Sequence, residues 1–233
     1  MCVFKIGPET KFPGAVHDFY DVFHYVANGN FGDKIDSNKI AISGDSAGGN
    51  LTAVTSSLAV KDGLHNQIKI QAPLCGAFDN TPSSRATSRS FQSFQSGYFL
   101  SAETMNFFGK CYFNNPNSET ETKDPLASPN LATSFSNLPL TYIAAASHDP
   151  LLTESIEYAK KLKDAGVSCT LKIFPGIHIF WMFPQQCGKT ECENFVNELC
   201  QHVSSAFDNN DEVTSNRRKY KALNKNAIFF YNT

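Results

Sequence analysis

The stretch "KIAISGDSAGGN", residues 39–50, decides the fold class of this chain. Residues 39–43 are mostly apolar and predict a short buried strand, whereas residues 47–60 carry Leu51, Val54 and Leu58 at helical spacing. Ser46 stands between them in the pattern Gly-x-Ser-x-Gly. A serine on a sharp turn between a strand and a helix is typical of an activated nucleophile.

The glycines around Ser46 have a physical role, because a tight turn leaves no space for larger side chains. The following helix begins at this turn, so its free N–H groups and positive dipole end face the serine. We therefore predict that the Ala47 N–H is one donor to an oxyanion. The alternative is a glycine-rich turn in which Ser46 only caps the helix. A phosphate-binding loop is disfavoured, because no Gly-Lys-Ser/Thr follows.

Strands and helices alternate outward from this turn. Further strands are predicted at residues 2–6, 67–74, 138–146 and 167–174, and further helices at 13–28, 151–165 and 189–207. This alternation at short spacing predicts an α/β fold with a mostly parallel sheet flanked by helices.

The chain divides into one domain and a tail. Residues 1–207 are the predicted domain, within which residues 76–136 are rich in Ser, Thr, Asn, Pro and Phe. We expect a loop-rich insertion or cap there, with one helix near 101–113. Residues 208–233 are polar and predict a poorly ordered tail, in which "AIFFY" at 227–231 could dock.

Composition limits the classes of partner. The 233 residues are 41% hydrophobic and 18% charged, with a formal net charge of −2, which is typical of a globular protein without a basic face. Nucleic acid is therefore not an expected partner. The seven cysteines are scattered without zinc-ligand spacing, so we expect reduced thiols, with one disulfide left open.

No signal peptide and no membrane-spanning run is visible in the sequence. The sequence leaves the compartment unknown: we expect a cytoplasmic protein as the chain stands, or one associated with the endoplasmic reticulum if an N-terminal anchor is missing.

Several segments resemble the hormone-sensitive-lipase-like branch of the α/β-hydrolases. They run between residues 3 and 207: "FKIGPETKFPGAVHDF" (4–19), "GDSAGGNL" (44–51), "GYFLS" (97–101), "DPLASP" (124–129) and "LPLTYIAAASHDPLLTES" (138–155). "LPLTY" is similar to arylacetamide deacetylases in particular. The resemblance implies the α/β-hydrolase fold and carboxylesterase activity.

A serine nucleophile needs a general base, and the base needs an orienting carboxylate. In α/β-hydrolases the chain order is serine, acid, histidine. His178 follows the strand "CTLKIF" (169–174) on a loop at a strand end, where a catalytic base belongs. The other histidines fit less well, because they precede the acid region, adjoin an acid candidate or lie within the last helix: His17, His24, His65, His148 and His202.

Two aspartates begin an Asp-Pro-Leu run, Asp124 and Asp149. Asp149 follows a long apolar strand and opens a helix, whereas no strand precedes Asp124, so position favours Asp149. The resemblance agrees, because the family's acid begins a run like "DPLLTES". We therefore predict Ser46 as nucleophile, Asp149 as orienting acid and His178 as base. The alternative is structural: a capping aspartate and a polar loop histidine.

Two departures from the family stand out. Ile179 follows His178 where the family has glycine, and a β-branched residue does not easily take a glycine-type backbone angle, so we expect a differently aimed loop. The family's His-Gly-Gly-Gly oxyanion loop is also missing, because the one adjacent glycine pair is Gly48-Gly49. We therefore expect an N-terminally truncated hydrolase.

The sequence thus predicts a serine hydrolase that cleaves small apolar acyl esters through an acyl-enzyme on Ser46, with no metal or organic cofactor. The phenylalanine-rich segment 91–108, with Phe180 and Trp181, suggests an apolar pocket. Two alternatives stay open: a catalytically impaired or non-catalytic ligand-binding relative, and a fragment of a larger esterase.

Overall fold

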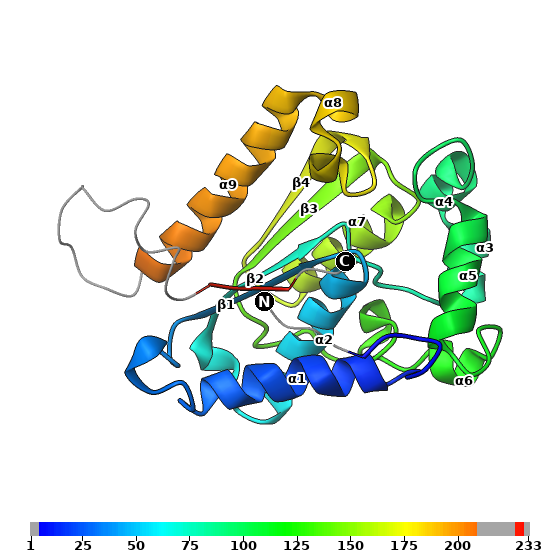
Figure 1. Cartoon of the computed structure of the whole chain (residues 1–233). Coiled ribbons are helices and arrows are strands. Elements are labelled where there is room, and N and C mark those ends of the chain that lie inside the picture. Colours follow the sequence, from blue (N-terminus) through cyan, green and yellow to red (C-terminus); the bar gives the residue numbers. More distant parts are fainter. Residues whose placement is uncertain (1–4, 209–226, 231–233) are drawn as a thin grey trace.

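A five-stranded sheet, ordered β4-β3-β2-β1-β5, lies at the centre of the computed structural model, which describes residues 5–208 and 227–230 (Figure 1). Every neighbouring pair of strands is parallel. The strands are β1 (Ile40–Asp45), β2 (Ile68–Leu74), β3 (Thr141–His148), β4 (Cys169–Ile177) and β5 (Ala227–Phe230). The predicted α/β-hydrolase fold with a parallel sheet is confirmed.

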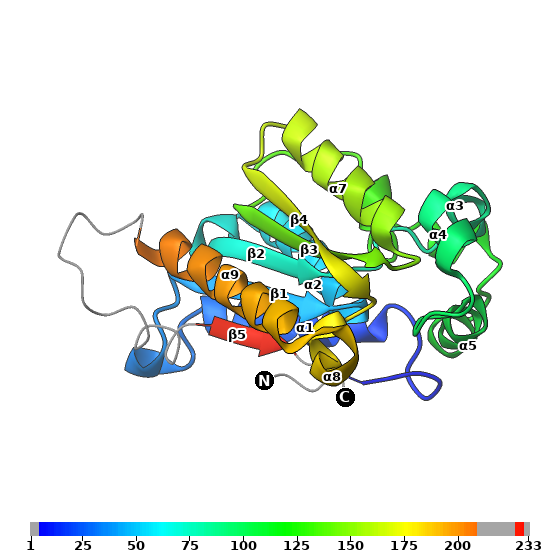
Figure 2. The same ribbon diagram turned by 90° about the horizontal axis from the view of Figure 1, so that it is seen from above.

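Helices cover both faces of the sheet (Figure 2). The face opposite α9 is covered by α1 (Gly14–Ala27), α2 (Ala47–Lys61) and α7 (Leu152–Asp164), and α9 (Lys189–Asp208) covers the other face. The alternation of side chains along a strand explains both contacts. In β3, Tyr142 and Ala144 belong to a buried hydrophobic cluster between the sheet and α9, called here the cluster under α9, whereas Ile143 packs with α7.

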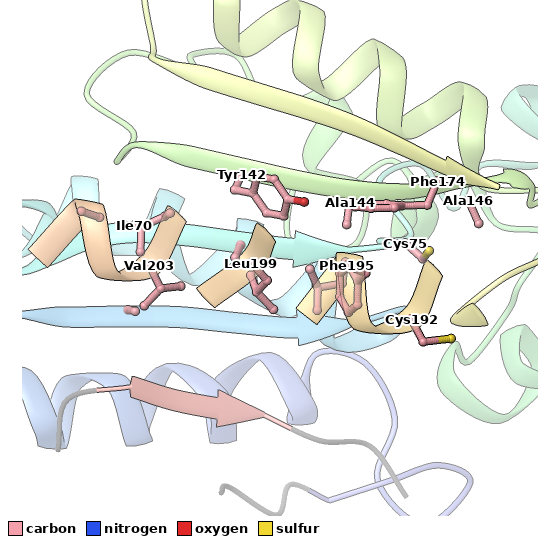
Figure 3. Close-up of a cluster of buried hydrophobic side chains, with 14 of the residues drawn as sticks. Ile70, Cys75, Tyr142, Ala144, Ala146, Phe174, Cys192, Phe195, Leu199 and Val203 are labelled. Atoms are coloured by element: carbon pink, nitrogen blue, oxygen red, sulfur yellow. The ribbon is translucent and has the colours of Figure 1, made fainter. Parts of the chain in front are cut away.

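The cluster under α9 shows how that helix is held. Phe195, Leu199 and Val203 of α9 lie against the strands that carry Ile70 and Tyr142 (Figure 3). All five side chains are less than 9% exposed. Each large apolar side chain buried in this way contributes about 1.5–3 kcal/mol.

The insertion at residues 76–136 contains more helix than the sequence predicts. The expected helix near 101–113 is α5 (Ala102–Tyr112), and three short helices accompany it: α3 (Pro82–Thr87), α4 (Arg89–Phe94) and α6 (Glu119–Thr122). The sequence did not predict these three helices, because each is too short to show a helical periodicity of apolar residues. Their caps are Thr81, Ser88 and Ser118, whose side chains accept hydrogen bonds from first-turn N–H groups.

The remaining elements are short. They are α8 (Pro184–Cys187) and four 3₁₀ turns: η1 (Gly32–Lys34), η2 (His65–Gln67), η3 (Pro129–Leu131) and η4 (Phe180–Met182). Among the described helices, none combines the length and the apolar character needed to cross a membrane.

The two ends of the chain differ in part from expectation. Of the strand predicted at 2–6, residues 2–4 lie outside the described residues, and Lys5 and Ile6 are not in a strand. Most of the predicted tail, 208–233, also lies outside the described residues. Its residues 227–230 form β5, which pairs with β1 from Ala41 opposite Ala227 to Gly44 opposite Phe230.

Candidate active site

Ser46 occupies the turn between β1 and α2 with φ 56° and ψ −114°. A non-glycine residue in this region costs about 1–3 kcal/mol, so the surrounding structure must enforce it. The backbone of β2 and of the segment after it does so: the Ser46 N–H donates to the Leu74 carbonyl at 2.8 Å, and the Ala77 N–H donates to the Ser46 carbonyl at 3.3 Å.

Two glycines make this turn possible by permitting close backbone contact. A Cβ on Gly44 would lie 2.6 Å from the backbone carbonyl of Gly48, and one on Gly49 would lie 2.7 Å from the Cα of Gly76. Both distances are too short for real atoms. The glycine pattern is therefore explained by packing between the strand end, the helix start and the segment after β2.

Asp149 and His178 follow β3 and β4 directly, so all three predicted side chains lie at the carboxyl ends of parallel strands. The structure joins them in one chain of hydrogen bonds. His178 Nε2 lies 2.9 Å from Ser46 Oγ, and His178 Nδ1 lies 2.8 Å from Asp149 Oδ2. The strands point toward the side of the molecule where α3, α4 and α5 gather (Figure 2).

Burial favours one arrangement of protons in this chain. Asp149 is 1% exposed and His178 is 3% exposed, whereas Ser46 is half-buried and faces a cavity. The second carboxylate oxygen, Oδ1, accepts the Leu151 N–H at 2.9 Å, which fixes the acid. With Nδ1–H donating to the carboxylate, Nε2 is free to accept the Ser46 hydroxyl proton. The arrangement can therefore activate Ser46 as a nucleophile.

Ile179 adopts the glycine-type angle that its side chain disfavours, with φ 50° and ψ 39°. Whether the loop is aimed differently from that of the family stays a prediction, but the His178 ring reaches both partners. The left-handed conformation costs a residue with a Cβ about 1–2 kcal/mol. Packing of the Ile179 side chain against the cluster under α9 and the 2.9 Å bond from the Met182 N–H to the Ile179 carbonyl hold it in place.

A cavity of about 400 Å³ opens beside Ser46 and Ala47. Its wall is mainly apolar and includes Leu100, Met105, Phe107, Phe108 and Leu151. Two predicted pocket residues lie elsewhere: Phe180 is fully buried, and Trp181 stacks on Phe195 of α9 at 4.4 Å between ring centroids. Those two rings belong to the core because η4 turns them under α9.

Cys75, which is not among the predicted site residues, follows β2 and is fully buried. Its sulfur and the ligand atoms of Asp149 and His178 all lie within 4.8 Å of one another. These three donors do not favour a metal ion, because burial raises the pKa of the Cys75 thiol well above its ordinary value and His178 already hydrogen-bonds Asp149. The donor set therefore favours a neutral thiol beside the acid. The position of Cys75 at the end of a predicted strand was the sequence signal that could have indicated this residue.

The rejected candidates lie in other settings. His148 is exposed, with Nδ1 2.8 Å from Ser147 Oγ, and His202 stacks on Tyr142. Asp124 lies in a turn after α6, where its Oδ1 accepts the Leu126 N–H at 2.9 Å. None of them is bonded to Ser46.

Comparison with known proteins gives consistent matches. A family model described as alpha/beta hydrolase fold matches residues 3–182. An arylesterase of Saccharolobus solfataricus is 34% identical over 185 residues, which cover 78% of this chain and 57% of that protein. An ethyl acetate hydrolase of Pseudomonas putida is 30% identical over 179 residues, covering 75% of this chain and 52% of that protein.

Solved structures agree in fold. An esterase of Pyrobaculum calidifontis superposes with a TM-score of 0.76 at 35% identity, covering 87% of this chain and 64% of the other. One of two fungal esterases from Rhizomucor miehei gives a TM-score of 0.80 at 31% identity, covering 89% and 64%. The chain spans about half the length of the curated relatives that it matches.

Proposed function

Because this chain belongs to the α/β-hydrolase fold family, in its hormone-sensitive-lipase-like branch, we propose that it is a serine hydrolase of carboxylic esters. The observation that carries the proposal is the continuous chain of hydrogen bonds from Ser46 Oγ through the His178 ring to the buried Asp149 carboxylate. The relatives named above are esterases, which supports the same reaction class.

In the proposed reaction, Ser46 Oγ attacks the ester carbonyl carbon while His178 Nε2 takes the hydroxyl proton. The oxyanion forms near the start of α2, where the Ala47 N–H has no acceptor within the helix and can donate to it. His178 then gives the proton to the leaving alcohol oxygen, and an acyl-enzyme remains on Ser46. Water attacks the acyl carbon with His178 again as base, which releases the acid and restores Ser46. Asp149 orients the ring and stabilises its charged form throughout.

The cavity supports short apolar acyl groups as substrates. Its volume of about 400 Å³ is at the lower end of the range for small-molecule sites. Leu100, Met105 and Leu151 line the same cavity as the serine, and these side chains offer dispersion contacts without hydrogen-bond partners. We therefore propose esters with short aliphatic chains rather than long lipids.

Labelling with a fluorophosphonate, together with hydrolysis of p-nitrophenyl acetate, tests the proposal. We expect an adduct on Ser46 and a loss of about 10⁴-fold or more in kcat in Ser46→Ala and His178→Ala. Ser136→Ala, which removes an exposed hydroxyl, serves as the matched control and should retain activity.

The same assay separates the alternatives. A protein that unfolds cooperatively but gives no adduct on Ser46 would contradict the proposal and favour a non-catalytic ligand-binding role. Hydrolysis that survives in Ser46→Ala would place the reaction at another group.

A further inference from the structure

Arg85 is one of the few charged residues that line the otherwise mainly apolar cavity beside Ser46. It lies on the short helix α3 and is half-buried. Its Nη1 donates to Asn106 Oδ1 over a long distance of 3.4 Å. Its Nε is buried, and no group in the described part of the chain accepts a hydrogen bond from it. Burial also lowers the pKa of the Arg85 guanidinium below its ordinary value.

The acidic side chains near Arg85 are engaged elsewhere. Glu154 Oε2 accepts the Asp79 N–H at 2.5 Å, and Asp79 Oδ1 accepts the N–H and the hydroxyl of Thr81. Within residues 5–208, neither carboxyl forms an ion pair with Arg85. Burial raises the pKa of Glu154 well above its ordinary value, which holds that carboxyl toward its neutral form. The charge of Arg85 is therefore only partly compensated.

A buried donor without an acceptor is costly. Among the eight buried side-chain atoms without a hydrogen-bond partner in the described residues, Arg85 Nε is the one whose residue lines the cavity beside Ser46. We propose that Arg85 is a specificity-determining residue that binds a carboxylate on the substrate, so that the preferred substrates are short aliphatic esters bearing a carboxylate. This inference rests on the proposed ester hydrolysis at Ser46. A carboxylate fits because its two oxygens match the planar fork of a guanidinium, while the apolar wall takes the aliphatic chain.

Two matched pairs of esters test the inference and show whether the preferred carboxylate lies on the acyl part or on the alcohol part of the substrate, called the acyl arm and the alcohol arm. Monomethyl glutarate is compared with methyl pentanoate for the acyl arm, and 4-acetoxybutanoate with butyl acetate for the alcohol arm. For at least one pair, we expect kcat/KM to favour the carboxylate ester in the wild type. In Arg85→Met that preference should fall by about 10- to 100-fold, the range for a hydrogen bond to a charged group.

Two further variants make the test specific. Arg85→Lys keeps the charge but loses the fork, so its preference should fall between wild type and Arg85→Met. Arg89→Met removes the same charge from an exposed position on α4, and its preference should equal that of the wild type. Thermal melts confirm that each variant folds. Equal preference in wild type and Arg85→Met, with hydrolysis of the neutral esters retained, would overturn the inference.

Binding separates this inference from the proposed function. Calorimetry on Ser46→Ala should show monomethyl glutarate or 4-acetoxybutanoate binding about 10- to 100-fold tighter than its neutral partner, and Ser46→Ala/Arg85→Met should lose that difference. If the wild type hydrolyses none of the esters but this binding difference is found, the proposed reaction fails while the carboxylate site stands. If binding shows no difference, the assignment of Arg85 is wrong.

Discussion

Backbone strain is concentrated at the residues around the candidate site. Four non-glycine residues in the described chain have positive φ, and three of them, Ser46, Cys75 and Ile179, lie next to or within the hydrogen-bonded group. Such strain persists only where the surrounding contacts over-determine the conformation, and it gathers at functional sites. The three strained residues follow the carboxyl ends of β1, β2 and β4, where the candidate site forms.

The strain at Ile179 can be measured by comparing two truncations. Ile179→Gly and Ile179→Ala both lose the side chain that packs under α9, but only glycine adopts φ near 50° without a penalty. We expect the glycine variant to be about 1 kcal/mol more stable than the alanine variant, as measured by urea unfolding. Equal stabilities would show that this position is unstrained in solution.

Glu154 predicts a pH dependence of stability. Glu154 is 8% exposed, and burial raises the pKa of its carboxyl in the folded state. Above the unfolded value of about 4.3, the unfolded chain therefore holds fewer protons on this group, and stability falls as pH rises. Glu154→Gln removes this slope, so its stability relative to wild type should rise by up to about 1.4 kcal/mol per pH unit until the native carboxyl ionises.

Urea unfolding at several values between pH 5 and pH 8 checks this expectation. Glu157→Gln, an exposed change on the same helix α7, is the matched control and should follow the wild type. A constant difference between Glu154→Gln and wild type across that range would contradict the prediction.

At the scale of elements, the contact between α2 and the segment after β2 positions the serine. Gly49 of α2 lies against Gly76, and Asn50 next to it donates to the carbonyls of Ala77 and Ala127 at 2.7 and 2.8 Å. These bonds tie α2 to both the segment after β2 and the end of the insertion. Asn50 and Ala77 also line the cavity beside Ser46, so this junction forms part of the cavity wall.

The same substitution should have opposite effects in two helices. Gly49→Ala would place a Cβ 2.7 Å from the Gly76 Cα, so we expect destabilisation by about 1–3 kcal/mol. Gly109→Ala in α5 meets its nearest atom at 3.5 Å, an ordinary contact, and should stabilise by about 0.5–1 kcal/mol through helix propensity. Thermal or urea unfolding measures the change in stability of both variants. An unchanged stability in Gly49→Ala would show that the backbone around Gly49 and Gly76 shifts to accommodate the added Cβ.

At the scale of the whole molecule, β5 lies on the edge of β1, the strand that leads to Ser46. An uncovered edge strand presents a row of free N–H and C=O groups, which is a template for pairing with another chain. The backbone of residues 227–230 therefore covers the edge of β1.

Shortening the chain tests this role. A chain that ends at residue 226 loses β5, and we expect it to self-associate with increasing concentration in sedimentation velocity experiments. A chain that ends at Phe230 keeps β5 and should behave like the full chain. Identical sedimentation of the two shortened chains would contradict this role of β5.

Much of the fold could be predicted from the sequence, because the long helices and the central strands have clear apolar periods. The short helices α3, α4 and α6 could not be, since each is six residues or fewer and is held by caps and neighbours. The pairing of β5 with β1 depends on an edge far away in the chain, which no local pattern reveals.

The sequence alone determined the fold class and singled out Ser46, Asp149 and His178, because strand ends in a parallel sheet mark where side chains converge. Their catalytic roles stay predictions until Ser46 is labelled. Only the tertiary structure decided that Ile179 is forced into a left-handed angle, that Cys75 lies beside the acid and that Arg85 lines the cavity. These features depend on contacts between residues distant in the chain, and a linear pattern does not specify such contacts.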